Sequence, residues 1–214
     1  MPAKIPIETS ARHIHMSRPD FEFFFGKGAE MTPLRELSQP GQFLASERLS
    51  IQGPKGSFEN VAILGPFRPE TQIEVSVTDT RHLGLPAVIR MSGDVAGTPG
   101  CTLHHASGRC LDIPQGLIVA KRHIHMTPVD AIQMKVKDKD EVFVIMESYE
   151  RSLIYADVVV RVHPDFRLAM HVDTDEANAF VNDHSFGTIL KLFDGSTYSL
   201  QQWARELQQG IARY

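Results

Sequence analysis

The sequence contains two nearly identical hexapeptides, RHIHMS at Arg12–Ser17 and RHIHMT at Arg122–Thr127. Five consecutive identical residues are improbable by chance in a chain of 214 residues. An acidic residue follows each copy at the same distance, Asp20 in the first and Asp130 in the second. The copies are separated by about half of the chain, and this spacing indicates an internal duplication. We therefore expect each half to contribute the same chemical group.

The histidine spacing favours an extended segment. In a strand, alternate side chains share a face, so the two imidazoles of one copy would point the same way, about 6.6 Å apart. On a helix they would lie roughly 200° apart and could not reach one ion. Apolar runs at Gly116–Ala120 and Ile5–Thr9 precede the motifs and predict strands. Ser17–Asp20 and Thr127–Asp130 resemble helix N-caps with proline in the first turn. Each His-x-His pair is thus expected where a strand ends and a helix begins.

The composition is that of an ordinary globular protein, with 42% hydrophobic and 22% charged residues and a formal net charge of −4. This charge gives no basic surface of the kind that nucleic acid requires, so we expect no nucleic-acid partner. No apolar run reaches the about 18 residues of a membrane span, and the first motif leaves no room for a secretory signal. We therefore expect a cytoplasmic protein with no membrane partner. Its two cysteines, Cys101 and Cys110, are expected to be free thiols.

Periodicity predicts the main elements between and after the motifs. Asp20–Phe25 is expected to form a short helix whose phenylalanines pack inward. Apolar and polar residues alternate in Ile73–Asp79, and most residues of Ile154–Val162 are apolar. Both patterns predict strands. Ser92–Gly116 is rich in glycine and proline, which predicts loops and hairpins at the junction of the halves. Leu200–Ile211 places its apolar residues on one stripe, as an amphipathic helix does.

A second pair of similar segments, one in each half, supplies a third donor to each half. Ile73–Asp79 and Met170–Asp175 share a Thr-Asp sequence near their ends, which makes Glu74 and His171 near-equivalent. Imidazole nitrogens together with a carboxylate favour zinc, and six donors suit two ions with three donors each. The candidate metal ligands are therefore His13, His15, Glu74, His123, His125 and His171.

Arginines near the motifs have two expected roles. Arg68 stands in a Gly-Pro-x-Arg turn six residues before Glu74, and its guanidinium suits a phosphate or carboxylate, although a solvated loop arginine fits the sequence equally well. Arg12 and Arg122 have the opposite strand parity from the histidines and should point away to backbone or acidic partners. Three acidic residues could either hold imidazole N–H groups or cap helices, and we expect caps: Asp79, Asp173 and Asp175. Five histidines outside the motifs carry no pattern, His82, His104, His105, His163 and His184.

Several motifs together carry a family resemblance. The two hexapeptides, with Leu64–Arg68, Thr71–Asp79, Ser92–Asp94 and His171–Asn178, resemble the phosphate propanoyltransferases of the propanediol-utilisation type over about residues 5 to 185. The resemblance implies a mainly β fold of two entwined β-barrels from an internal duplication, capped by short α-helices. It assigns residues 1–12 to a strand that joins the second barrel, 13–120 to the first barrel half and 121–195 to the second. Residues 196–214 remain as the C-terminal amphipathic helix.

The same resemblance implies an enzyme and a reaction. Two zinc ions would lie between the barrels, held by the six donors given above, and Arg68 would be the essential catalytic arginine that holds phosphate. The reaction would convert acyl-CoA plus phosphate to acyl phosphate plus coenzyme A, and the reverse. It needs no protein nucleophile, which agrees with the lack of a Ser-His-Asp pattern.

The resemblance also carries expectations about partners. A homo-oligomer is expected, in the cytoplasm or in the lumen of a bacterial microcompartment engaged in propanediol degradation. Microcompartment members typically carry an N-terminal targeting helix, and the sequence before the first motif predicts none, so encapsulation by that route is not expected. Residues 196–214 could contact the shell or cargo, or cover their own core. Two other functions fit the donor set, a dizinc hydrolase of an amide or ester and a non-catalytic metal-binding protein.

Overall fold

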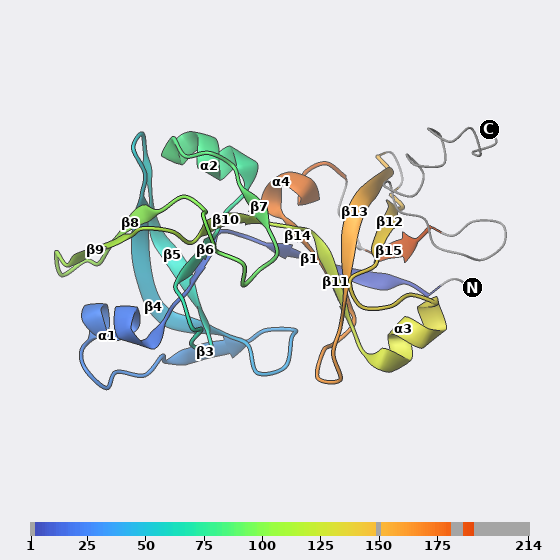
Figure 1. Cartoon of the computed structure of the whole chain (residues 1–214), viewed down its shortest axis with the longest axis horizontal. Helices are drawn as coiled ribbons and strands as arrows, with labels where there is room; N and C mark the ends of the chain where they lie inside the picture. The colour runs from blue at the N-terminus through green and yellow to red at the C-terminus, as the bar shows by residue number, and fades with distance from the viewer. Residues whose placement is uncertain (1–2, 149–150, 181–185, 191–214) are drawn as a thin grey trace. The chain divides into compact units, whose positions relative to one another are not determined.

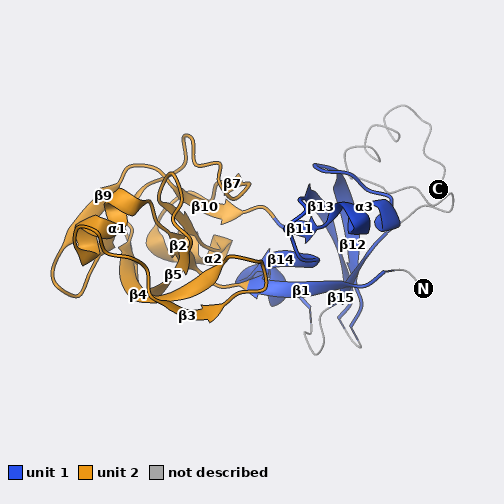
Figure 2. Cartoon of the chain, turned by 90° about the horizontal axis from the view of Figure 1, so that it is seen from below, with its two compact units in different colours: residues 1–9, 122–214 blue, residues 10–121 orange. Residues whose placement is uncertain are grey.

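A computed structural model describes residues 3–148, 151–180 and 186–190 (Figure 1). The chain divides into two compact units (Figure 2). Unit 1 comprises Met1–Thr9 and Arg122–Tyr214, and unit 2 comprises Ser10–Lys121. Both consist mainly of β-strands with a few short helices, which confirms the predicted fold class. The helix expected at residues 196–214 lies outside the described residues.

Unit 2 is built on one sheet that curls into a partial barrel. The strand order is β7-β10-β6-β2-β5-β4-β8-β9, and β3 pairs with β4. The strands are β2 His13–His15, β3 Pro33–Glu36, β4 Phe43–Gln52, β5 Ser57–Gly65, β6 Gln72–Glu74, β7 Ile89–Arg90, β8 Cys101–His104, β9 Cys110–Ile113 and β10 Leu117–Ala120. Two helices accompany them, α1 Arg18–Phe25 and α2 Val77–Leu83.

Unit 1 is a closed six-stranded barrel with the order β1-β14-β11-β13-β12-β15. Its strands are β1 Ile5–Ser10, β11 His123–Met126, β12 Glu141–Met146, β13 Leu153–Val162, β14 Ala169–Asp173 and β15 Phe186–Ile189. Its helices are α3 Pro128–Met134 and α4 Thr174–Ala177. The N-terminal strand β1 pairs with β15, so the start of the chain belongs to the unit that holds the second motif.

The duplication is visible in the strand pairing around each motif. Strand β2 pairs in parallel with β5 on one side and antiparallel with β6 on the other. Strand β11 pairs in parallel with β13 and antiparallel with β14. Each central strand thus has the same two kinds of neighbour, and a helix follows it directly. The two motifs occupy equivalent places in the two units.

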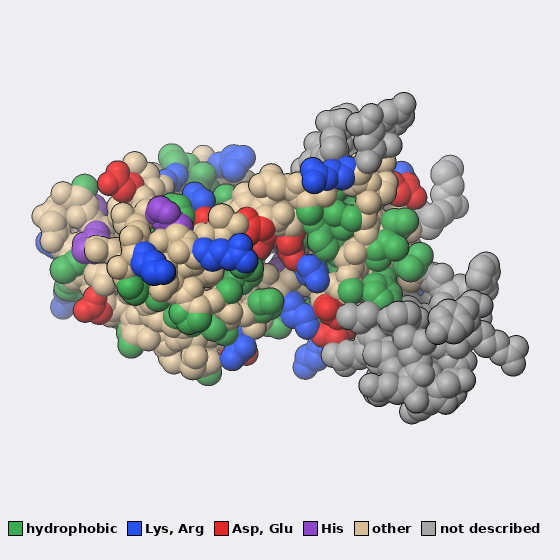
Figure 3. Space-filling model, turned by 90° about the horizontal axis from the view of Figure 1, so that it is seen from above, with side chains coloured by type: hydrophobic (Ala, Val, Ile, Leu, Met, Phe, Trp, Pro, Cys, Tyr) green, Lys and Arg blue, Asp and Glu red, His purple; other side chains and the backbone are tan. Residues whose placement is uncertain are grey.

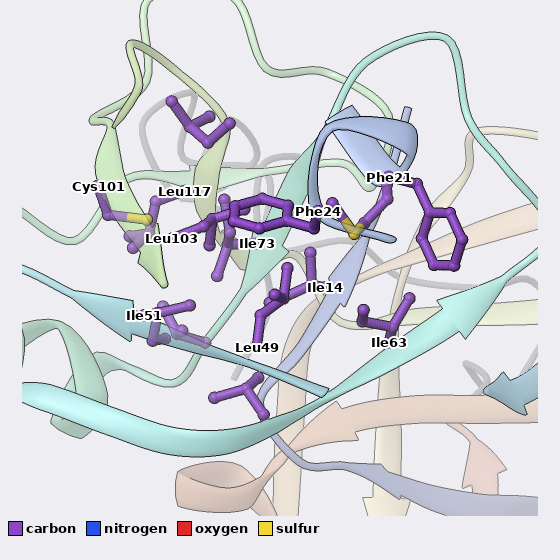
Figure 4. Close-up of a cluster of buried hydrophobic side chains, with 14 of the residues drawn as sticks. Ile14, Phe21, Phe24, Leu49, Ile51, Ile63, Ile73, Cys101, Leu103 and Leu117 are labelled. Atoms are coloured by element: carbon purple, nitrogen blue, oxygen red, sulfur yellow. The ribbon is translucent and has the colours of Figure 1, made fainter. Parts of the chain in front are cut away.

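Each unit buries its own apolar core, and the motif strands contribute to both. Ile14 and Ile124, between the paired histidines, are fully buried and point to the face opposite the imidazoles. Figure 4 shows Ile14 among the side chains of neighbouring strands in the core of unit 2. Burial of one such side chain contributes about 1.5–3 kcal/mol. Met16 and Met126 are fully buried as well.

Helix α1 follows the predicted pattern with one exception. Ser17 caps the helix by accepting a hydrogen bond from the Asp20 backbone, and Phe21 and Phe24 are buried. Phe23 is 46% exposed, so the prediction that all the phenylalanines pack inward is wrong for this side chain. The helical period places Phe23 away from the face that Phe21 and Phe24 share. Among the described residues, no helix is long and apolar enough to cross a bilayer.

The stretch Ile73–Asp79 is not one strand as its alternating apolar residues predicted. Strand β6 ends at Glu74, and α2 begins at Val77. Ser76 and Asp79 form a reciprocal capping box, in which each side chain accepts the backbone N–H of the other residue. These hydrogen bonds satisfy the first turn of the helix and therefore outweigh the β-propensity of Val77.

Charged side chains are mixed on the face seen in Figure 3, where basic and acidic groups of the described residues lie interspersed.

The two free cysteines lie on the β8–β9 hairpin in different environments. Cys101 is buried and Cys110 is exposed. Burial raises the pKa of the Cys101 thiol to about 12. At about pH 8 such a thiol is ionised in about one molecule in 10⁴, and the thiolate is the reactive form.

We predict that iodoacetamide at mildly alkaline pH modifies Cys110 in the folded protein and leaves Cys101 unmodified. Denaturation before labelling should make both residues react, as intact-mass measurement can show. The variant Cys110→Ser serves as the control and should take up no label while folded. Rapid labelling of that folded variant would contradict the burial of Cys101.

Candidate functional site

Three predicted donors meet in unit 2. The Nε2 atoms of His13 and His15 lie 3.2 Å apart. The Glu74 carboxylate lies 3.6 Å from Nε2 of His13 and 3.7 Å from Nε2 of His15. All three residues are buried, and their donor atoms lie within 4.8 Å of one another. We call this group the unit 2 cluster.

Strand register explains why these three side chains converge. His13 stands directly opposite Glu74 in the antiparallel pairing of β2 with β6. His15 shares the face of His13 because successive side chains of a strand alternate. The Nδ1 atom of His13 lies 2.8 Å from the Ala11 carbonyl and can donate to it, which leaves Nε2 as the lone-pair atom that faces the cluster.

The electrostatic environment favours the metal-binding forms of His15 and Glu74. Burial lowers the pKa of His15 to about 3, and the neighbouring His13 acts in the same direction. Burial alone would raise the pKa of Glu74, but the charges of His13 and His15, the hydrogen bond from Ser92 and the charge of Arg68 lower it. The last two effects persist when the imidazoles are neutral. A neutral imidazole and an ionised carboxylate are the states that bind metal ions.

A polar network holds the Glu74 carboxylate. Its Oε1 atom accepts hydrogen bonds from Ser92 Oγ and Gln72 Nε2, each 2.6 Å long. Arg68 donates to the same Ser92 hydroxyl over 2.9 Å, and the Gly93 backbone donates to Gln72 over 2.7 Å. Oε1 is therefore committed to protein donors, while Oε2 is the carboxylate oxygen 3.6 Å from His13. One hydroxyl links the guanidinium to the candidate ligand.

The other three predicted donors meet in unit 1. The ring centroids of His123 and His125 lie 4.6 Å apart, those of His125 and His171 lie 4.9 Å apart, and those of His123 and His171 lie 5.3 Å apart. His123 stands opposite His171 in the pairing of β11 with β14, as His13 stands opposite Glu74. We call this group the unit 1 cluster. Its third member thus occupies the position of Glu74.

The two clusters differ in compactness and in their neighbours. Among the residues that the structure describes, only the unit 2 cluster brings three donor atoms within 4.8 Å. In the unit 1 cluster His123 and His171 are stacked, with 13° between the ring planes. Glu8 on β1 lies 3.7 Å from Nε2 of His171. Burial lowers the pKa of His125 to about 2, and the charges of His123 and His171 act in the same direction.

The chemistry of both donor sets fits a transition metal. In the unit 2 cluster the Nε2 atoms of His13 and His15 and the Glu74 carboxylate converge in a buried space. Two imidazoles with one carboxylate, as in unit 2, or three imidazoles, as in unit 1, are ligand sets that zinc takes in sites with open positions.

The remaining predicted residues lie outside the two clusters. Arg12 and Arg122 point to acidic partners, Asp79 and Glu176, as their parity predicted. Asp79 and Asp173 cap helices α2 and α4. Several unpatterned histidines have local partners instead: His82 with Ser57, His105 with Ser107 and His163 with Asp165. His104 lies on β8, and His184 lies outside the described residues.

Three residues around the clusters were not singled out as site residues from the sequence. Gln72 shares a strand face with Glu74, two residues away, and this parity was the available signal. Ser92 appeared only as part of a family motif, because its contact with Glu74 spans 18 residues. The strand that contains Glu8 was predicted from the apolar residues beside it, and nothing in that pattern pointed to Glu8 itself.

The sequence is similar to known proteins over most of its length. The family model described as phosphate propanoyltransferase matches residues 6–183. A phosphate propanoyltransferase of Thermotoga maritima is 54% identical over 82% of this chain and 83% of its own length. One from Enterococcus faecalis is 53% identical over 81% of each chain, and one from Salmonella typhimurium is 46% identical over 87% of this chain and 89% of its own. The chain therefore belongs to the phosphate propanoyltransferase family, and it is an acyltransferase.

Proposed function

We propose that the chain interconverts short-chain acyl-CoA plus phosphate and acyl phosphate plus coenzyme A, with one zinc ion in each histidine cluster. The observation that carries this proposal is the adjacency of a buried donor set and a guanidinium in unit 2. Arg68 is joined to Glu74 through the single hydroxyl of Ser92. A candidate metal site and a candidate phosphate-binding group therefore share one network, which would place phosphate beside the ion.

Each of the six candidate donors would bind one of the two ions. His13, His15 and Glu74 would hold one ion, and His123, His125 and His171 would hold the other. When bound, zinc supplies Lewis acidity toward a thioester carbonyl and toward the sulfur that departs. The protein contributes two preformed clusters, in which burial favours the neutral forms of His15 and His125.

Arg68 would hold the phosphate that attacks the thioester. A guanidinium matches two phosphate oxygens at once, and Ser92 fixes the direction from which it is presented. In the forward reaction a phosphate oxygen forms a bond to the carbonyl carbon. The bond from carbon to sulfur breaks, and coenzyme A departs as a thiolate. The positive charge of Arg68 stays close to the phosphate oxygens while this charge redistributes.

A covalent protein intermediate is not required. Cys101 is a poor candidate nucleophile because its pKa is raised to about 12 and its side chain is buried in the core of unit 2. Direct transfer from thioester to phosphate therefore accounts for the reaction with the groups described.

Family membership also supports further parts of the proposal. A homo-oligomer is proposed, located in the cytoplasm or in a microcompartment lumen, with acyl-CoA and phosphate as its small-molecule partners. Shell or cargo contact through residues 196–214 stays a prediction, because these residues lie outside the described ranges.

The activity test is the phosphate dependence of coenzyme A release. Purified protein loaded with zinc is incubated with acetyl-CoA or propanoyl-CoA, with and without inorganic phosphate. We expect loss of the thioester absorbance only with phosphate, together with acyl phosphate that hydroxylamine traps as a hydroxamate. Phosphate-independent release would instead identify a hydrolase, and no release would identify a non-catalytic metal-binding protein. Either result would overturn the proposed transferase.

Arg68→Ala is predicted to retain metal while losing turnover by at least about 10²-fold, because it removes a charge that acts on the reacting phosphate. Steady-state kinetics and metal analysis of the same sample provide the two measurements. Arg35→Ala is the control, since Arg35 is an exposed arginine on β3 of the same unit. Loss of zinc from Arg68→Ala would assign this residue to the metal site instead.

His15→Ala and His125→Ala are each predicted to remove about one of two zinc ions, because each variant takes one donor from one cluster only. The stoichiometry is measured by elemental mass spectrometry after removal of loosely bound metal. His105→Ala should retain both ions, as His105 contacts Phe25 and Ser107 rather than either cluster. Retention of two ions in His15→Ala would refute the unit 2 assignment.

A further inference from the structure

An arginine and a carboxylate occupy the same place beside each cluster. In unit 2, Arg12 donates two hydrogen bonds to Asp79, from Nε over 3.2 Å and from Nη2 over 2.8 Å. In unit 1, Arg122 donates from Nη1 to Glu176 over 2.6 Å and from Nε to the Ala156 carbonyl over 2.8 Å. None of these residues is a candidate metal ligand.

The sequence positions of the two pairs correspond. Each arginine directly precedes the first histidine of its cluster, and each acid follows the third donor by five residues. Both acids also complete the capping box of the helix behind that donor. Asp79 accepts from the Ser76 backbone, and Glu176 accepts from the Asp173 backbone, over 3.2 Å in each case. One carboxylate thus fixes the helix start and the arginine together.

An aromatic ring supports each guanidinium from an equivalent position. The guanidinium carbon of Arg12 lies 4.1 Å from the ring centre of Phe58, and that of Arg122 lies 5.1 Å from the ring centre of Tyr155. Both rings belong to the strand that pairs in parallel with the histidine strand. Each ring precedes by two residues a non-glycine residue with φ of 54°, Asn60 in one unit and Asp157 in the other.

The clamp, by which we mean the arginine, its acid and its ring, joins the start of the histidine strand to the helix that follows the third donor. The residues have changed between the halves, from Asp79 to Glu176 and from Phe58 to Tyr155, while the arrangement is the same. Asp79 is almost fully buried, so its ion pair is shielded from solvent more than a surface pair is. An arrangement that survives such changes points to a role beyond one local contact.

We propose that Arg12 and Arg122 are positioning residues that hold the first histidine of each cluster in register with the third donor. This inference rests on the proposed metal sites. Residues that orient metal ligands without binding the ion typically change metal affinity by about 10- to 100-fold when they are lost. Each clamp is therefore expected to set the affinity of its own cluster and not of the other.

The test measures Co²⁺ binding by Arg12→Gln and Arg122→Gln, prepared free of metal in the full-length chain. Competition with a coloured chelator gives the affinity of each ion, and the visible absorption of Co²⁺ reports its coordination geometry. Each variant should bind one ion as the unmodified protein does and the other about 10- to 100-fold more weakly. The absorption band of the weakened site should change as well.

Two further variants separate positioning from folding. Asp79→Asn keeps an acceptor for the Ser76 backbone but removes the charge that Arg12 contacts, so it should weaken the same ion as Arg12→Gln. Arg12→Lys keeps the charge without the two-pronged contact and should restore affinity in part. The thermal midpoint of each variant is measured in the metal-free state.

Arg18→Gln is the matched control in unit 2. Arg18 also forms two hydrogen bonds with an acid, Glu30, and lies 4.3 Å from the ring centre of Phe67. It starts helix α1 and does not join the donor strands, so both Co²⁺ affinities should remain unchanged.

Unchanged Co²⁺ affinities and spectra in Arg12→Gln, Asp79→Asn and Arg122→Gln would overturn the positioning role, even if their thermal midpoints fell. Equal weakening by Arg18→Gln would overturn it too, because the effect would then be general. If the unmodified protein bound no Co²⁺, the proposed metal sites would fail, and this inference would fail with them. Weakening confined to one ion in each clamp variant would support the proposal.

Discussion

The central constraint is the register between each histidine strand and its antiparallel neighbour. His13 opposite Glu74 and His123 opposite His171 are direct cross-strand pairs, so their side chains share a face. A slip of one residue would turn Ile14 toward the donors and bury imidazoles in the apolar core. Because Ile14 and Ile124 are fully buried, core packing and donor geometry require the same register. The stability of the fold therefore fixes the site.

Strand parity was sufficient to predict part of this arrangement from the sequence. It placed two imidazoles on one face and turned Arg12 to the other, and the shared Thr-Asp sequence related Glu74 to His171. It could not show which strands flank the motif, since pairing partners depend on the folded chain. The alternating apolar residues Ile73, Val75 and Val77 predicted one longer strand, and this prediction was wrong. The Ser76–Asp79 capping box starts a helix there instead. Ser92 was missed as a site residue because only folding brings it to Glu74.

The buried carboxylate shows how stability and chemistry use the same residues. An ionised glutamate that loses water is destabilising unless donors replace that water. Ser92 and Gln72 do so at Oε1, and they are held in turn by Arg68 and the Gly93 backbone. The network satisfies Oε1 and leaves Oε2 facing the His13 imidazole. The Ser92 hydroxyl therefore contacts the carboxylate and the guanidinium at once.

The duplication explains why the third donor could change while the rest of each cluster did not. The first two donors come from one strand, where period-two alternation fixes their common face whatever the partner is. The third comes from a neighbouring strand, and its place depends on register alone, so glutamate and histidine fit the same position. The substitution changes charge, because a carboxylate brings a negative charge that an imidazole lacks. In unit 1 the Glu8 carboxylate lies 3.7 Å from His171, so a negative charge approaches that cluster from a different strand. Two related half-chains thus keep one backbone arrangement and differ in where the negative charge is placed.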